Sequence, residues 1–210
     1  MNKDDKLAAL KIAETGADKN AFIQIAKAML AESDAEIYKR AVAALLRCSQ
    51  GGVDTEMFAT FNTLWNKSQK AEKSLLLKIL PRVKAENSAR ALSMARIAAC
   101  ESGLADETVK TLSHWRDTSA LPLMVVIAES AENERSKIIA QIAIVALGAK
   151  IGFDDASADY ILKNSVRAEE RELCASEIAK HPSPAKIDSL KAAKFPDKLI
   201  KTAEKNLPKK

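Results

Sequence analysis

The sequence predicts an all-α protein, and three observations lead to this prediction. Alanine, leucine, lysine and glutamate are abundant among its 210 residues, whereas glycine and proline number only six each. The chain is therefore rich in good helix formers and poor in the two residues that interrupt helices. Apolar residues recur at a helical period along the whole chain, and no segment alternates apolar and polar residues as a half-buried strand does. With 47% apolar residues, the protein can bury a sizeable core.

Three helices in the first half are predicted from their apolar faces and their end signals. The helix over 34–48 has the inward residues Ile37, Ala41, Ala44, Leu45 and Cys48. Ser33 or Asp34 can cap its start, and Gly51 and Gly52 end it. The helix over 54–67 has Asp54 as its cap and the inward residues Met57, Phe58, Phe61, Leu64 and Trp65. The helix over 69–80 has a stripe of Leu75, Leu76, Ile79 and Leu80, and Pro81 disfavours its continuation.

The same patterns predict ten further helices, which gives about 13 in all. They are expected at 4–14, 18–31, 87–100, 105–115, 119–130, 133–147, 155–164, 167–181, 184–194 and 197–206.

Residues 111–130 contain a short junction between two of these helices. Trp115 closes the first helix, and residues 117–119 form the turn. Ser119 can cap the second helix, which places Pro122 inside the first turn, where backbone N–H groups have no helical acceptor. A turn of this length lets the two helices lie antiparallel.

The starts of every second helix are regularly spaced. They fall near residues 34, 69, 105, 133, 167 and 197, at intervals of 28 to 36 residues. This interval is typical of helix–turn–helix repeats. We therefore expect one domain over 1–210, a right-handed α-solenoid of about six antiparallel helix pairs. A capping helix is expected over 1–16, and a capping helix pair with a basic tail over 183–210.

The junction also carries a resemblance to a known family. Residues 107–147, ETVKTLSHWRDTSALPLMVVIAESAENERSKIIAQIAIVAL, resemble the HEAT repeat, an armadillo-like family, and are similar to HEAT-type modules of bacterial multidomain proteins. A Trp–Asp–Ala-Leu-Pro junction recurs in those modules, although residues 141–144 depart from the arginine and glycine of their second helix. The resemblance implies an α-α superhelix whose second helices line a concave face, and such stacks usually serve as protein-binding scaffolds.

The charges, the histidines and the sequence motifs limit the kinds of function and partner that are expected. The net charge is +5, distributed as +5 over 1–100, −5 over 101–181 and +5 over 182–210. His114 and His181 have no metal-binding partners at helical spacing, and motifs for phosphate binding or hydrolysis are missing from the sequence. We expect no enzyme activity, no cofactor and no metal. The expected partner is a protein or peptide, and a monomer is expected although the sequence does not determine the oligomeric state.

Basic residues near the starts of the second helices are the candidate partner-binding residues. They are Lys39, Arg40, Lys73, Lys110, Lys137 and Arg171. They can bind an acidic partner, or they can form an exposed charge ladder with Glu36, Glu72, Glu134 and Glu169. The two interpretations are compatible.

The alternative function is nucleic-acid binding. A bacterial family of DNA glycosylases that acts on alkylated bases is also built from HEAT-like repeats, and Trp65, Trp115 and Asp117 are the candidates for its tryptophans and aspartate. Only 4% of the residues are aromatic, which leaves little to stack on bases. Both tryptophans also lie where core packing is expected, so the protein-binding scaffold is preferred. A third interpretation is a spacer or accessory module of a larger protein.

The cysteines and the longest apolar run indicate the compartment. Cys48, Cys100 and Cys174 lie 52 and 74 residues apart within apolar helical patterns, so buried free thiols are expected. Such thiols favour a reducing compartment, and the cytoplasm is expected unless a leader preceded Met1. The longest apolar run, residues 121–128, is much shorter than the roughly 20 residues that span a bilayer. A soluble protein without membrane contacts is expected.

Overall fold

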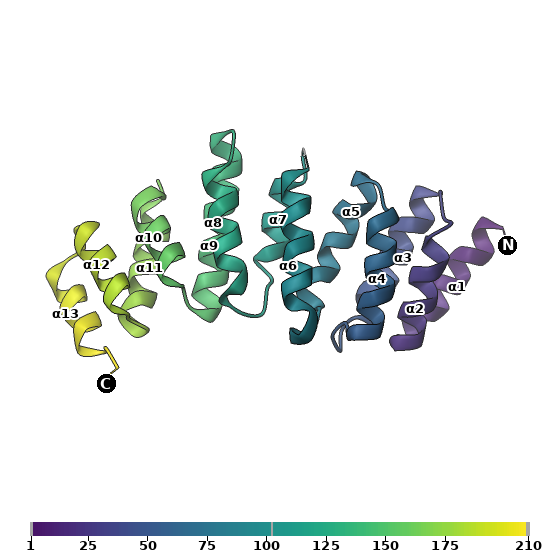
Figure 1. The fold of residues 1–210 in the computed structure, drawn as a ribbon, viewed down its shortest axis with the longest axis horizontal. Coiled ribbons are helices and arrows are strands. Elements are labelled where there is room, and N and C mark those ends of the chain that lie inside the picture. Colours follow the sequence, from purple (N-terminus) through teal and green to yellow (C-terminus); the bar gives the residue numbers. More distant parts are fainter. Residues whose placement is uncertain (1, 102, 209–210) are drawn as a thin grey trace. The chain divides into compact units, whose positions relative to one another are not determined.

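The computed structural model describes residues 2–101 and 103–208, and these residues form helices joined by short turns (Figure 1). Thirteen α-helices and two 3-10 helices are present in the described ranges, without any strand. The all-α prediction is confirmed. The chain divides into two compact units, residues 1–108 and residues 109–210, each with its own core.

The first unit contains α1 to α6 and the 3-10 helix η1. Helix α7 begins in this unit and ends in the second. Its elements are α1 (Lys3–Thr15), α2 (Lys19–Met29), α3 (Ala35–Cys48), α4 (Thr55–Lys67), α5 (Lys70–Leu76), η1 (Leu77–Arg82), α6 (Ala85–Cys100) and α7 (Ala105–Leu112).

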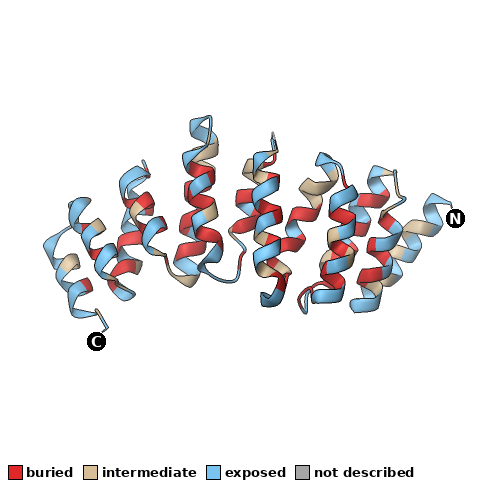
Figure 2. Ribbon diagram, in the orientation of Figure 1, coloured by how far each residue is buried: buried red, intermediate tan, exposed pale blue. Residues whose placement is uncertain are grey.

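Most helices of this unit contact more than one neighbour. Helix α2 packs against α3 and α4, while α3 also packs against α1, α5 and η1. Helix α4 also packs against α6. The faces turned toward these neighbours are buried and the outward faces are exposed, which gives the alternating colours of Figure 2. The predicted inward residues of the helices at 34–48 and 54–67 are all buried, because the apolar stripe of each helix faces its neighbours.

Aspartate caps start three of these helices. The carboxylates of Asp18, Asp34 and Asp54 accept hydrogen bonds from backbone N–H groups in the first turns of α2, α3 and α4. Of the two predicted caps for the third helix, Asp34 is therefore the cap. These bonds satisfy donors that have no partner within the helix.

The predicted helix at 69–80 is divided in the structure. Helix α5 ends at Leu76, and Pro81 lies inside the 3-10 helix η1. Proline lacks the N–H that an α-helix would use, so the chain tightens before it. Leu75 is only half-buried, whereas the other predicted stripe residues are buried.

The loop after α3 forms backbone and side-chain hydrogen bonds with the end of η1. Gly52 adopts a φ of 94°, which favours glycine, and Val53 then forms a parallel bridge with Val83. Arg82 donates hydrogen bonds from Nη1 to the carbonyl oxygen of Leu46 and to Oγ of Ser49, at 3.2 Å for the latter. A guanidinium thus binds the C-terminal end of α3, where a cation is favoured by the helix dipole.

The second unit contains the last residues of α7 and six further α-helices. Its elements are η2 (Thr118–Ala120), α8 (Leu121–Glu129), α9 (Glu134–Ile151), α10 (Asp155–Asn164), α11 (Ala168–Lys180), α12 (Pro184–Ala192) and α13 (Asp197–Lys205). Helix α9 packs against α8, α10 and α11, and α10 and α11 pack against α12 and α13 respectively.

The junction at 111–130 has a different cap from the predicted one. Asp117, not Ser119, is the capping residue, and its carboxylate accepts hydrogen bonds from N–H and Oγ of Ser119. Residues 118–120 form η2 before α8 begins, so the chain completes a 3-10 turn first. Pro122 lies in the first turn of α8, as predicted. Helix α7 ends at Leu112, three residues before Trp115.

The predicted burial of all three thiols is wrong for Cys100. Cys48 and Cys174 are buried, but Cys100 is exposed at the end of α6. Ile97, one turn earlier, is 58% exposed, so this side of α6 faces outward at its C-terminal end. No described helix has the length and apolar character needed to cross a membrane.

Candidate functional site

The predicted partner-binding residues differ in how they are held. Lys39 and Arg40 are exposed on α3, and within the described residues neither has a carboxylate closer than 4.0 Å. Their charges are therefore available to a partner.

Lys73 is held by contacts within the protein. Its Nζ lies 2.5 Å from Oε1 of Glu101 and 5.9 Å from the centroid of the Trp65 ring. Its side chain is 19% exposed. An ammonium group over an indole face is favourable, so Lys73 contributes to the packing of α4, α5 and the end of α6.

The other three residues belong to the second unit. Lys110 and Arg171 are exposed on α7 and α11, and Lys137 is half-buried on α9. None of the three takes part in an ion pair with another residue that the structure describes. Lys110 and Arg171 therefore resemble Lys39 and Arg40 in their availability.

A charge ladder is present, but its lysines are different from the predicted ones. Nζ of Lys3 lies 3.2 Å from Asp34 and 2.7 Å from Glu36, and Nζ of Lys19 lies 3.1 Å from Asp54 and 2.7 Å from Glu56. Each lysine is the first residue of its helix, α1 or α2. It pairs with two acids at the start of the helix two places along, α3 or α4, namely the N-cap aspartate and the second helical residue.

The predicted ladder is therefore wrong in most of its members. Of the four predicted acids, only Glu36 has a base within 4.0 Å among the described side chains, and that base is Lys3. Oε2 of Glu72 instead accepts a hydrogen bond from the backbone N–H of Gln69, 2.8 Å away, in a capping box. The repeated Asp-x-Glu at 34–36 and 54–56 is the sequence signal that could have located the ladder.

The ladder shifts the pKa values of both lysines and of Asp54. The hydrogen bond to Glu36 raises the pKa of Lys3 above its ordinary value, and the hydrogen bond to Glu56 does so for Lys19. The backbone N–H of Met57 and the ammonium of Lys19 hold the pKa of Asp54 below its usual range. These groups are charged at neutral pH and neutralise one another.

The residues of the nucleic-acid alternative do not form one surface. Trp65 and Trp115 are each only 3% exposed, and Trp65 packs 6.1 Å from Phe61 between ring centroids. Asp117 is exposed, but its carboxylate caps η2. The two indoles therefore lie in the core, and their faces are covered.

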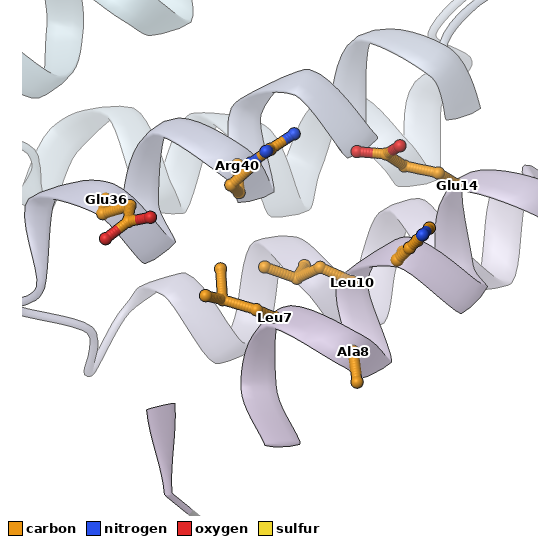
Figure 3. Close-up of a pocket in the computed structure, with 7 residues that line it drawn as sticks. Leu7, Ala8, Leu10, Glu14, Glu36 and Arg40 are labelled. Atoms are coloured by element: carbon orange, nitrogen blue, oxygen red, sulfur yellow. The ribbon is translucent and has the colours of Figure 1, made fainter. Parts of the chain in front are cut away.

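A surface hollow lies between α1 and α3 (Figure 3). It has a volume of about 410 Å³ and is lined by Leu7, Ala8, Leu10, Lys11, Glu14, Glu36 and Arg40. The volume lies within the range of about 300–1,000 Å³ that is usual for ligand sites. Sequence reasoning identified Arg40 but missed the hollow, because the hollow depends on how α1 lies against α3.

A metal site is not found in the described ranges, since no group of three His, Cys, Asp or Glu side chains is placed to hold an ion.

The chain matches no protein-family model, no curated protein and no solved structure.

Proposed function

We propose that this protein is a non-enzymatic scaffold of the HEAT type, a right-handed α-solenoid that binds an acidic protein partner on a concave face. The proposed face consists of the second helices of the pairs, of which α3, α7 and α11 carry the exposed bases. Support for the repeat comes from packing. Helices α1 to α4 in the first unit and α8 to α11 in the second each contact the helix two places along, and α8 to α11 also each contact the next helix. Such contacts between neighbours are the basis of repeat proteins.

The observation that carries the proposal is the contrast between two sets of bases. Lys3, Lys6 and Lys19 are paired with carboxylates, at 2.7 to 3.2 Å. The exposed bases of the proposed face, Lys39, Arg40, Lys110 and Arg171, have no such pairing among the side chains described. Charges that stabilise no internal contact are suited to recognising an oppositely charged partner.

Capture of partners from a lysate of the source cell tests this proposal. The test variant combines Lys39→Glu, Lys110→Glu and Arg171→Glu, three exposed positions on α3, α7 and α11. The control combines Lys27→Glu, Lys67→Glu and Arg96→Glu. These bases are also exposed and without an ion pair among the described residues, but they lie on the first helices α2, α4 and α6, and their reversal changes the net charge equally. A partner retained by the wild type and the control but lost by the test variant supports the proposal. Equal retention by all three proteins contradicts it.

Nucleic-acid binding is the second candidate, and the sequence pI of about 9.0 is the observation in its favour. The buried tryptophans count against it because aromatic faces stack on bases in many such proteins. Anisotropy of labelled duplex and single-stranded DNA at about 50 and 200 mM salt distinguishes the two, since phosphate contacts weaken steeply with salt. Binding in the micromolar range with a steep salt dependence would favour nucleic acid.

The compartment and the oligomeric state complete the proposal. The three cysteines are present as thiols, which suits a reducing compartment such as the cytoplasm. We expect the protein to act as a monomer there.

A further inference from the structure

Helix α1 is unusual because it has no buried residue. It packs against α3, and its apolar Leu7 and Leu10 are only half-buried beneath the hollow that separates the two helices. Apolar side chains of an amphipathic helix are normally covered by a neighbour. The hollow of about 410 Å³ therefore has an apolar floor that none of the described residues of the first unit fills.

The rim of the hollow carries four charges, and they fall into two classes. Glu36 lies 2.7 Å from Nζ of Lys3, and Glu14 lies 4.0 Å from Nε of Arg47. Both carboxylates thus face bases that do not line the hollow.

The two bases of the rim differ from these carboxylates. Within residues 2–101 and 103–208, neither Lys11 nor Arg40 has a carboxylate within 4.0 Å. Figure 3 shows the Arg40 side chain extending from α3 along the hollow, on the opposite side from Leu7 and Leu10. A guanidinium in this position can bind a carboxylate through two parallel N–H donors.

We propose that the α1–α3 hollow binds a peptide segment of the partner in which an apolar side chain stands next to an acidic one. The apolar side chain covers Leu7 and Leu10, and the acidic side chain binds Arg40 and Lys11. This inference rests on the proposed scaffold function and names the partner chemistry at one part of its surface. Charge complementarity selects an acidic peptide, since the carboxylates of the rim are already paired and its bases have no carboxylate partner among the described residues.

Selection from a random peptide library displayed on phage, followed by anisotropy with the most enriched labelled peptide, tests the site. Ala8→Trp places an indole at the edge of the hollow, because Ala8 is exposed and is one of its lining residues. Ala9→Trp is the matched control, since Ala9 is exposed on the same helix and does not line the hollow. Arg40→Glu removes the anion-binding charge, and Lys27→Glu on α2 is its control. Helicity of each variant is checked by circular dichroism.

The enriched peptides are expected to share an apolar residue beside an acidic one. Ala8→Trp and Arg40→Glu are each expected to weaken their binding about tenfold or more, which corresponds to about 1.4 kcal/mol, while the two controls bind as the wild type does. The inference is overturned if the selection returns no such peptide, or if binding is insensitive to both hollow variants. Peptides that lose binding with Lys39→Glu but not with Ala8→Trp would overturn the hollow and leave the scaffold function in place.

Discussion

Aspartate residues at helix starts have two tasks in the first unit. Asp34 and Asp54 each accept two backbone N–H hydrogen bonds and also pair with a lysine of a neighbouring helix. A single carboxylate thereby satisfies helix donors and joins two helices. The capping task could be predicted from the sequence for both residues, because a cap depends only on nearby residues.

Removal of one of these carboxylates should destabilise the protein measurably. Asp54→Ala leaves the N–H groups of Glu56 and Met57 without their acceptor, and the free energy of unfolding should fall by about 0.5–2 kcal/mol. Urea unfolding followed by circular dichroism measures this change. Asp4→Ala is the control, since Asp4 lies in the first turn of α1 but is not its cap, and it should cost less.

The same carboxylates make stability depend on acid pH. Hydrogen bonds from the N–H groups of Ile37 and Met57 lower the pKa values of Asp34 and Asp54 below the ordinary 3.8. A pKa that is lower in the folded state gives stability that is present above about pH 4 and lost as the pH falls through the folded value.

A variant with Asp34→Asn and Asp54→Asn keeps cap acceptors but has no charge to titrate. Its urea midpoint should therefore fall less than that of the wild type between about pH 5 and pH 2. Equal losses in the two proteins would show that these carboxylates do not contribute to the acid dependence.

The three thiols should react at very different rates with a disulfide reagent. Burial raises the pKa of Cys174 to about 12 and also raises the pKa of Cys48, whereas Cys100 is exposed. The thiolate is the reactive form, and it reacts only where the reagent can reach it. We expect one thiol to react quickly in the folded protein and three in denaturant, with Cys100→Ser abolishing the fast reaction. A fast reaction that persists in Cys100→Ser would contradict the buried positions.

At the scale of single elements, α9 packs closely against the loop that follows it. Helix α9 ends at Ile151, Gly152 adopts a φ of 92°, and Phe153 folds back against Gly148. A Cβ added at Gly148 would lie 2.5 Å from Cδ1 and Cζ of the Phe153 ring. Glycine inside a helix is normally unfavourable, so the close approach of the ring explains why it is placed here.

Gly148→Ala should therefore destabilise the protein despite the better helix propensity of alanine. Overpacking costs about 1–3 kcal/mol, which exceeds the gain of about 1 kcal/mol from propensity. Chemical unfolding should show a loss of about 1 kcal/mol, and Gly51→Ala, where no atom lies within 4 Å of the added Cβ, should show little change. In a Phe153→Leu background the cost of Gly148→Ala should become smaller. If Gly148→Ala destabilises the Phe153→Leu protein as much as the wild type, contact with the Phe153 ring is not the cause.

The positions of the helices could be predicted from the sequence because they depend on local periodicity and on caps. The helix predicted over 69–80 ends early, at Leu76, and Pro81 lies inside the 3-10 helix η1, which was not predicted. Contacts between helices are harder to predict, since Lys3 and Glu36 lie far apart in the sequence and meet only because α1 packs against α3. The hollow depends on that packing, and the ladder depends on it and on the packing of α2 against α4, which explains why neither was predicted correctly.

At the scale of the whole molecule, the two compact units share one chemical property. Exposed bases without carboxylate partners lie on α3 in the first unit and on α7 and α11 in the second, as judged over the described residues. The two tryptophans, by contrast, are buried, one in each unit. Exposed charge together with covered aromatic rings favours recognition of an acidic protein surface over stacking on nucleobases.

The central claim is tested most directly by the affinity for a captured partner. This affinity is measured by titration with the wild type and the two triple variants at low and moderate salt. We expect Lys39→Glu, Lys110→Glu and Arg171→Glu together to weaken binding about tenfold or more, because each reversal replaces an attraction by a repulsion. Lys27→Glu, Lys67→Glu and Arg96→Glu together should change it by less than about threefold. Equal weakening by both variants, or by neither, would contradict the assignment of the partner-binding face.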